Sequence, residues 1–137
     1  MLLRVSAQLV EGISEGLAER GFTDVRPVHG FVFAALAPRP VTASELAAEL
    51  QVTKQAAAQL ISYLLERGYV TREPDPRDRR AQLIALTDRG HACTVAAQES
   101  AEAYVGRWRD QLSPNEFDAL VDSLNRIALP GRLRPSW

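Results

Sequence analysis

The architecture of this chain depends on residues 42–88, TASELAAELQVTKQAAAQLISYLLERGYVTREPDPRDRRAQLIALTD. The stretch opens with Thr42 and Glu45, whose separation by three residues is the spacing of a helix-capping box. In such a box the hydroxyl accepts a hydrogen bond from an early helix amide, and the carboxylate accepts one from the amide of the capping residue. We therefore predict a short helix over residues 43–50.

A second, longer helix is expected after a very short connection. Thr53 can cap this helix, which extends to about Arg67 in our prediction. Gly68 then suits the left-handed conformation that commonly follows the end of a helix. Two helices joined by about three residues form a helix-turn-helix.

A β-hairpin with a charged tip is expected directly after the second helix. Residues 69–72 (YVTR) and 82–86 (QLIAL) have the character of strands, and the polar segment 73–80 (EPDPRDRR) predicts the loop between them. A short helix, a tight turn, a longer helix and a charged hairpin indicate a winged helix-turn-helix. In that motif the second helix enters the major groove of DNA.

Helices are also expected on both sides of this unit. Apolar residues three or four positions apart predict an N-terminal helix that ends at Gly21, and Pro27 is well placed to open a buried helix over residues 28–37. A long capped helix then extends as far as Ser113, which begins a further helix with a second capping box. The predicted order is α-α-α-α-β-β-α-α, mostly α with a small β-hairpin wing, in one domain over residues 1–137.

Composition and charge narrow the possible function classes. The chain has 137 residues, of which 46% are hydrophobic and 24% charged, and its formal net charge is −1. These values are typical of one globular domain and argue against both a disordered chain and a multidomain enzyme. No apolar run is long enough to cross a bilayer, and Arg4 and Glu11 interrupt the first residues, unlike a signal peptide. We expect a cytoplasmic protein with no membrane partner.

The second helix of the motif has a polar outer face that suits contacts with DNA bases. At about 100° per residue, its apolar residues share one side, and the opposite side carries Lys54, Gln55, Ala58, Gln59 and Ser62. Glutamine can pair with adenine through one donor and one acceptor, alanine fits against a thymine methyl, and a helix N-terminus with a lysine suits phosphate. The alternative interpretation is a solvated face on an ordinary amphipathic helix.

The expected hairpin tip carries three arginines, Arg77, Arg79 and Arg80, beside Asp75 and Asp78. Three guanidinium groups on a tight turn make a narrow cationic projection of minor-groove width. The two carboxylates can pair with neighbouring arginines and hold the shape of the loop. A solvated charged turn is the alternative, but the position directly after a helix-turn-helix favours contact with a groove.

Over nearly its whole length the sequence resembles the MarR family of bacterial transcriptional regulators. The matching segments are SELA (44–47), VTKQ (52–55), LERGYVTR (65–72), DPRDRR (75–80) and LTDRG (86–90). The resemblance implies a homodimeric repressor, with recognition helices in successive major grooves of a palindromic operator and wing arginines in the flanking minor grooves. It assigns residues 1–27 and 88–137 to a helical dimerisation region and residues 28–87 to a DNA-binding lobe.

On this basis both motif helices and the wing contribute contacts to double-stranded DNA. The residues expected to make them are Ser44, Thr53, Lys54, Gln55, Ala58, Gln59, Ser62, Arg77, Arg79 and Arg80. Arg77 is expected at the wing tip and Asp75 and Asp78 in its support, with Asp78 and Arg80 braced against each other. Many members of the family carry Thr-Arg where this chain has Ala58-Gln59, so a base-reading arginine is missing and guanine readout at that position is unsupported.

The terminal helices present more apolar surface than a monomer of this size can cover. The dimer interface that the resemblance implies is formed by Leu9, Ile13, Leu17, Phe117, Leu120, Val121, Leu124 and Ile127. The resemblance also implies a small aromatic or phenolic effector that binds between the two regions and releases DNA. Its candidate pocket residues are His29, Phe31, Phe33 and Trp108. Packing within the core of one protomer is the alternative for each of these residues.

No enzymatic activity, cofactor or metal site is expected. The sequence contains no nucleophile elbow, phosphate loop or metal-binding helix, and His91 and Cys93 point to different sides of their helix. Two alternatives to a ligand-controlled DNA-binding protein stay open. One is a winged helix retained for protein contacts alone, which gives no reason for three wing arginines. The other is a regulator that senses oxidants through Cys93, although the chain has no second cysteine to form a disulfide with it.

Overall fold

The structure, a computed structural model, describes residues 1–128 of the chain. It is mostly helical with a small antiparallel sheet. The elements of the described part are α1 (Leu2–Glu19), α2 (Pro27–Leu36), β1 (Val41–Thr42), α3 (Ala43–Leu50), α4 (Lys54–Glu66), β2 (Val70–Asp75), β3 (Asp78–Leu86), α5 (Asp88–Gln111) and α6 (Pro114–Ile127). Residues 129–137, which the sequence analysis assigns to the dimerisation region, lie outside the described residues.

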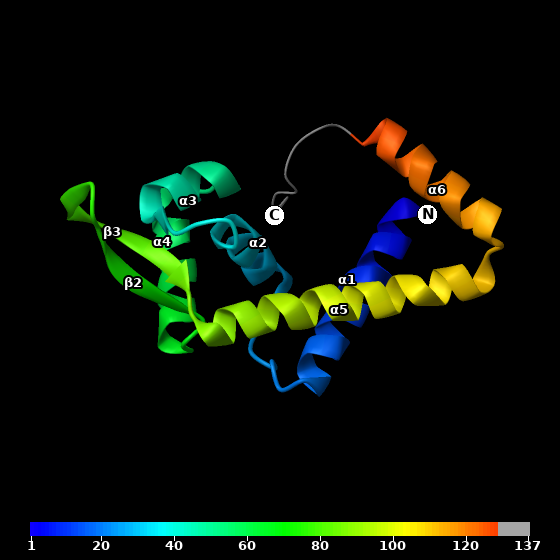
Figure 1. Ribbon diagram of the computed structural model, residues 1–137, viewed down its shortest axis with the longest axis horizontal. Helices are drawn as coiled ribbons and strands as arrows, with labels where there is room; N and C mark the ends of the chain where they lie inside the picture. The colour runs from blue at the N-terminus through cyan, green and yellow to red at the C-terminus, as the bar shows by residue number, and fades with distance from the viewer. Residues whose placement is uncertain (129–137) are drawn as a thin grey trace.

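The long helix α5 connects two ends of the molecule (Figure 1). The sheet, α3 and α4 lie at its N-terminal end, and α6 follows its C-terminal end. Helix α1 packs so closely on α5 that a Cβ atom at Gly12 or Gly16 would overlap the side chain of Tyr104 or Ser100. Within the described part of the chain, no helix combines the length and the hydropathy that crossing a membrane requires.

Helix starts follow the capping signals in the sequence. Thr42 Oγ1 accepts a hydrogen bond from the backbone N–H of Glu45 at 3.1 Å, and the Glu45 carboxylate accepts one from the Thr42 N–H at 2.8 Å. Ser113 and Glu116 form the same box at the start of α6. In both boxes the hydrogen bonds from the capping residue lower the pKa of the glutamate. Both predicted capping boxes are confirmed.

The turn between α3 and α4 is as short as the sequence predicts. Gln51 adopts a left-handed backbone conformation, with φ at 55°, and so reverses the chain after α3. Thr53 then caps α4, because its Oγ1 accepts a hydrogen bond from the backbone N–H of Ala56 at 3.1 Å. Helix α4 ends at Glu66, one residue before the predicted end, and Gly68 takes the expected left-handed conformation with φ at 73°.

The sheet has three strands, whereas the sequence analysis predicts only a hairpin. The additional strand β1 pairs antiparallel with β3, with Val41 opposite Ile84 and Thr42 opposite Leu83, and the strand order is β1-β3-β2. A strand of two residues is too short to show the alternation of apolar and polar residues from which strands are predicted. Its neighbour in sequence, the cap of α3, gives the stronger local signal.

The wing strands are also longer than predicted. Most of the segment 73–80, expected to be a loop, belongs to β2 and β3, and only Pro76 and Arg77 form the turn. Beyond Arg72 the hairpin extends away from the core, so almost every side chain on both faces is exposed. An exposed strand needs no apolar alternation, and the sequence signal for it is therefore lost.

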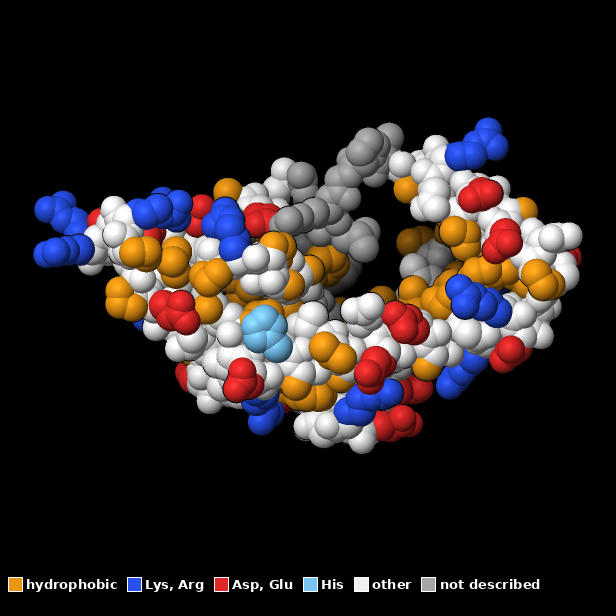
Figure 2. All heavy atoms as spheres, viewed as in Figure 1, with side chains coloured by type: hydrophobic (Ala, Val, Ile, Leu, Met, Phe, Trp, Pro, Cys, Tyr) orange, Lys and Arg blue, Asp and Glu red, His pale blue; other side chains and the backbone are white. Residues whose placement is uncertain are grey.

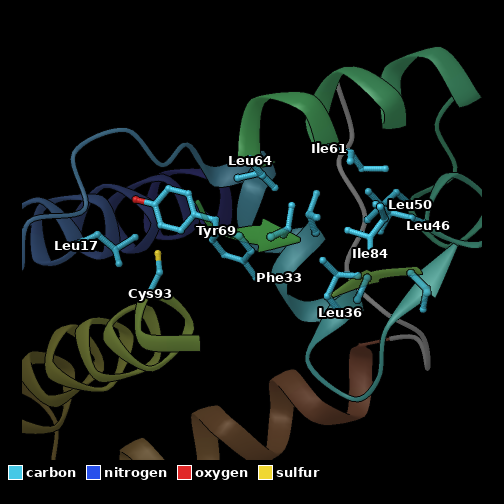
Figure 3. Close-up of a cluster of buried hydrophobic side chains, with 14 of the residues drawn as sticks. Leu17, Phe33, Leu36, Leu46, Leu50, Ile61, Leu64, Tyr69, Ile84 and Cys93 are labelled. Carbon is cyan, nitrogen blue, oxygen red and sulfur yellow. The ribbon is translucent and has the colours of Figure 1, made fainter. Parts of the chain in front are cut away.

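One hydrophobic core joins the helix-turn-helix and the sheet to α1 and the N-terminal half of α5 (Figure 3). Side chains from α2, α3, α4 and β3 converge in it, and the labelled ones are Phe33, Leu36, Leu46, Leu50, Ile61, Leu64 and Ile84. Tyr69 lies at the edge of this group, and its ring is next to Leu17 of α1 and Cys93 of α5. The helix-turn-helix and the sheet therefore pack directly against α1 and α5.

Candidate nucleic-acid interface and adjoining cavity

The outer face of α4 exposes the polar residues that the sequence analysis assigns to base contacts. Ala57, Ile61 and Leu64 are buried on the inner face. The outer face forms a shallow hollow of about 440 Å³, lined by Gln55, Ala58, Gln59, Ser62, Tyr63 and Glu66. Lys54 is exposed at the first position of the helix, and Ser44 is exposed on α3. The arrangement presents mostly neutral hydrogen-bonding groups on one helical surface.

The wing tip is built around the buried carboxylate of Asp75. This carboxylate accepts a hydrogen bond from the Arg77 backbone N–H at 2.9 Å and lies 3.4 Å from Arg77 Nε. The side chain of Arg77 is nonetheless 74% exposed. Asp78 accepts a hydrogen bond from the backbone N–H of Arg80 at 2.9 Å, so these two residues are braced through the main chain and both guanidinium groups at 79 and 80 stay exposed.

The Lys and Arg side chains at the wing end of the molecule project into solvent. Figure 2 shows blue Lys and Arg side chains extending beyond the apolar surface at the wing end. Residues 54–89 contain seven Lys or Arg residues against five Asp or Glu residues. A local excess of positive charge on projecting side chains suits contact with a polyanion, even though the whole chain has a net charge of −1.

A cavity of about 610 Å³ lies where α1, α2 and α5 meet. Its walls are mainly apolar and include Phe31 and Phe33, two of the four predicted pocket residues. The polar side chains that reach it are those of Ser14, Arg26, Glu49 and Gln98. His29 and Trp108, the other two predicted residues, are not among the residues that line this cavity.

His29 faces α4 instead. It is fully buried, its ring stacks on that of Tyr63 with centroids 4.6 Å apart, and its Nδ1 accepts a hydrogen bond from the Arg26 backbone N–H at 2.9 Å. Burial, assisted by the positive charges of Arg26 and Arg67, lowers the pKa of His29 to about 4. Trp108 packs edge-on against Tyr104, one turn away on α5.

Cys93 is fully buried and reaches the wall of the cavity from α5. Burial, followed by the negative charge of Asp24, raises the pKa of this thiol to about 11. A buried thiol that stays protonated at neutral pH is a poor nucleophile.

We therefore expect Cys93 in the native protein to be alkylated by iodoacetamide at least tenfold more slowly than in the urea-unfolded chain. Alkylation at equal rates would restore the oxidant-sensing alternative.

The predicted dimerisation residues fall into two groups. Leu17 and Phe117 are buried within the chain itself, and Leu9 and Ile13 are partly buried. The apolar side of α6 is exposed, with Leu120, Val121 and Leu124 each more than one-third accessible and Ile127 69% accessible. The beginning of α1 is exposed as well, including Leu2 and Leu3. The described structure thus has uncovered apolar helix faces at the end opposite the wing.

One group of contacts was missed by the sequence analysis. Asp24, in the loop between α1 and α2, contacts two tyrosines and two arginines that lie 39 to 65 positions later in the chain. No spacing rule links residues so far apart. The only available signal was an acidic residue in a turn, which is common in proteins of every kind.

Comparisons with known proteins agree with this geometry. The MarR family model matches residues 23–81. BadR, a transcriptional activatory protein from Rhodopseudomonas palustris, is 33% identical over 88 residues, which are 64% of this chain and 50% of BadR. This chain therefore matches only half the length of that relative.

Two solved structures have the same fold along almost the whole chain. CouR from Rhodococcus jostii RHA1, bound to p-coumaroyl-CoA, superposes with a TM-score of 0.66 at 27% identity. The match covers 97% of this chain and 92% of the CouR chain. A MepR variant from S. aureus, bound to an oligodeoxyribonucleotide, gives a TM-score of 0.70 at 22% identity over 92% of each chain. Over residues 23–81 the chain matches the MarR family model, and its fold is that of MarR-type winged helix-turn-helix structures.

Proposed function

We propose that this protein binds a specific palindromic DNA operator as a homodimer and represses transcription there. The observation that carries the proposal is the pairing of an exposed, hydrogen-bonding face on α4 with exposed arginines at the wing tip. The helix has the surface to read base edges in the major groove, and the wing has the charge and width to enter a minor groove. MepR, which shares this fold, has been solved with DNA bound.

Dimer formation is supported by the apolar surface at the other end of the molecule. The exposed leucines and valine of α6 and the exposed start of α1 would be buried if two copies joined there. A two-fold axis at this end would set two wings and two recognition helices in symmetric positions. Two recognition helices related by a two-fold axis require a palindromic site, with half-sites about one helical turn of DNA apart.

The cavity supports an effector site in the same protein. We propose that it takes a small aromatic molecule, because its walls are apolar and include the rings of Phe31 and Phe33. Its volume of about 610 Å³ is sufficient for such a ligand. The related CouR structure contains an aromatic acyl-CoA.

Selection from random DNA tests the proposed function with no operator sequence chosen in advance. Full-length protein is incubated with a random duplex library and non-specific competitor, and the enriched duplexes are titrated by fluorescence anisotropy. We expect a palindromic consensus bound at nanomolar concentration with two protomers per duplex. Weak, equal binding to all sequences would instead favour the protein-interaction alternative. Because BadR is named as an activatory protein, in vitro transcription from the selected site is needed to establish repression.

Replacing Arg77 should weaken binding to every DNA sequence. In Arg77→Ala we expect affinity for the selected duplex and for unrelated DNA to fall by a similar factor of about five, with a salt dependence of log K reduced by about one per protomer. The reason is that a wing guanidinium contacts phosphates and groove walls and releases counterions when it binds. Anisotropy titrations at several salt concentrations measure both quantities.

Gln59→Ala is the matched comparison, since Gln59 lies on the base-reading face of α4. This change should lower affinity for the selected duplex about tenfold and leave affinity for unrelated DNA unchanged. Unchanged affinity and salt slope in Arg77→Ala would show that the wing does not touch DNA.

A further inference from the structure

The loop between α1 and α2 holds a carboxylate that bridges three separate elements. Asp24 Oδ1 accepts a hydrogen bond from the hydroxyl of Tyr69 at 2.6 Å and lies 3.9 Å from Arg89 of α5. Asp24 Oδ2 lies 3.8 Å from Nε of Arg67, at the end of α4. The backbone carbonyl of Asp24 also accepts a hydrogen bond, from the Tyr63 hydroxyl of α4, at 2.6 Å.

The contacts with α4 hold the C-terminal half of the recognition helix. The side chain of Tyr63 is held on several sides: its hydroxyl donates to the Asp24 carbonyl, its ring stacks on the buried ring of His29, and the guanidinium of Arg67 lies 3.5 Å from its ring centroid. Arg67 also donates a hydrogen bond to the Tyr63 carbonyl oxygen at 3.2 Å. Tyr63 itself lines the hollow beside Gln59 on the outer face. The orientation of the base-reading face therefore depends on a loop outside the helix-turn-helix.

The contacts with Tyr69 and Arg89 attach the same loop to the start of α5. Tyr69 is fully buried, and its hydroxyl donates to Asp24 while it accepts a hydrogen bond from Arg89 at 3.2 Å. The guanidinium of Arg89 also lies 4.6 Å from the Tyr69 ring centroid. Burial and the hydrogen bond to Asp24 raise the pKa of Tyr69 to about 12, so its hydroxyl stays a donor at physiological pH.

The residues that follow Asp24 form part of the cavity. Val25, Arg26 and Pro27 line it directly, together with Gly30 in the first turn of α2. A molecule inside the cavity would therefore touch the segment that carries Asp24. The cavity wall and the anchor of the recognition helix are consecutive residues of one loop.

We propose that Asp24 is a positioning residue for the recognition helix, and that its loop transmits the state of the cavity to the base-reading face of α4. This inference rests on the proposed DNA-binding function and adds a route by which that function is regulated. Filling the cavity near residues 25–27 displaces the loop, the contacts with Tyr63 and Arg67 loosen, and α4 loses the alignment that paired hydrogen bonds to bases require. Contacts from the wing to phosphate, which need less accurate alignment, persist.

Tyr63→Phe isolates the link between loop and helix, because it removes one hydroxyl and keeps the ring stacked on His29. We expect affinity for the selected duplex to fall about tenfold, while affinity for unrelated DNA changes less than twofold. A residue with a purely structural role would lower the thermal midpoint without changing the ratio of the two affinities. Tyr104→Phe, on α5 beside Trp108, is the matched control and should leave both affinities unchanged.

Gly30→Leu tests the link between cavity and loop without any ligand. Gly30 lines the cavity, and a Cβ atom there meets nothing within 4 Å, so a leucine side chain has room beside the loop. We expect this change to lower specific affinity about fivefold in the wild-type background and less than twofold in Tyr63→Phe, because the connection is then already broken. Gly106→Leu, at an equally open position on α5, should have the same effect in both backgrounds.

Two results would overturn the inference. One is a Tyr63→Phe protein whose ratio of specific to non-specific affinity equals that of the wild type. The other is a Gly30→Leu protein whose effect is absent, or is equal in both backgrounds. If the wild-type protein selects no sequence at all, the proposed function fails, and hydrogen exchange then tests the contact between the Asp24 loop and α4 separately. In that case the amides of residues 64–67 should exchange about tenfold faster in Tyr63→Phe, and unchanged rates would contradict a positioning role.

Discussion

Gly90→Ala is expected to lower the free energy of unfolding by about 3 kcal/mol, although Gly90 lies within a helix where alanine is normally the better residue. A Cβ atom at this position would overlap the carbonyl oxygen of Tyr69 and press on Leu86. The backbone there cannot move aside easily, because the Tyr69 carbonyl accepts a hydrogen bond from the Thr87 N–H at 3.1 Å and the Thr87 hydroxyl donates to the Gly68 carbonyl at 2.6 Å. The start of α5 must therefore separate from the turn after α4.

Urea unfolding followed by circular dichroism measures this loss. Gly106→Ala on the same helix is the control, because a Cβ atom there meets nothing within 4 Å. Its expected effect has the opposite sign, a gain of about 0.5–1 kcal/mol from the higher helix propensity of alanine. Equal stability of Gly90→Ala and the wild type would show that the contact between α5 and the turn is looser than described.

Acidification from about pH 7.5 to about pH 5 is expected to lower the free energy of unfolding by about 2 kcal/mol through His29 alone. In the folded protein, burial and then the charges of Arg26 and Arg67 lower the pKa of this histidine to about 4, from an ordinary value of 6.5. Between these two values the unfolded chain binds a proton that the folded chain does not. The contribution of His29 is therefore complete above pH 6.5 and is lost progressively as the pH falls toward 4.

His29→Gln should flatten this pH dependence, because the glutamine amide does not titrate and its oxygen can accept the Arg26 N–H. His91→Gln, on the exposed side of α5, is the matched control and should keep the wild-type slope. At pH 5 and above, the capping residues Glu45 and Glu116 contribute little to the pH dependence of stability. Their pKa values are lowered, so the stabilisation they provide is lost only under more acidic conditions. A wild-type stability that is constant over this range would contradict a neutral, buried His29.

Local signals predicted most of the helical framework. The boxes at Thr42 and Ser113, the cap at Thr53 and the left-handed Gly68 each depend on residues no more than four positions apart, so their spacing is visible in the sequence. The outer face of α4 was predictable for the same reason, since helical periodicity separates its buried and exposed sides.

The features that sequence reasoning missed depend on contacts between distant segments. Strand β1 exists because β3 offers it a partner, and the length of the wing strands is set by pairing between exposed residues. His29 is expected in the pocket as an aromatic residue near the N-terminus of α2, but it is not among the residues that line the cavity, and its ring stacks on Tyr63 of α4 instead. The contacts of Asp24 join the loop to α4 and α5, which are far apart in the sequence, and no local pattern predicts them.

The length of α5 has a mechanical consequence for a dimer joined at the terminal helices. The helix has 24 residues, which at about 1.5 Å per residue makes a rigid rod of roughly 36 Å. In such a dimer the helix would act as a lever arm with its pivot at the two-fold axis, and a rotation of about 5° there would move the wing end by roughly 3 Å. Opposite displacements in the two protomers would add. A small rotation of α5 in each protomer would therefore shift the two copies of α4 out of register with successive major grooves of DNA.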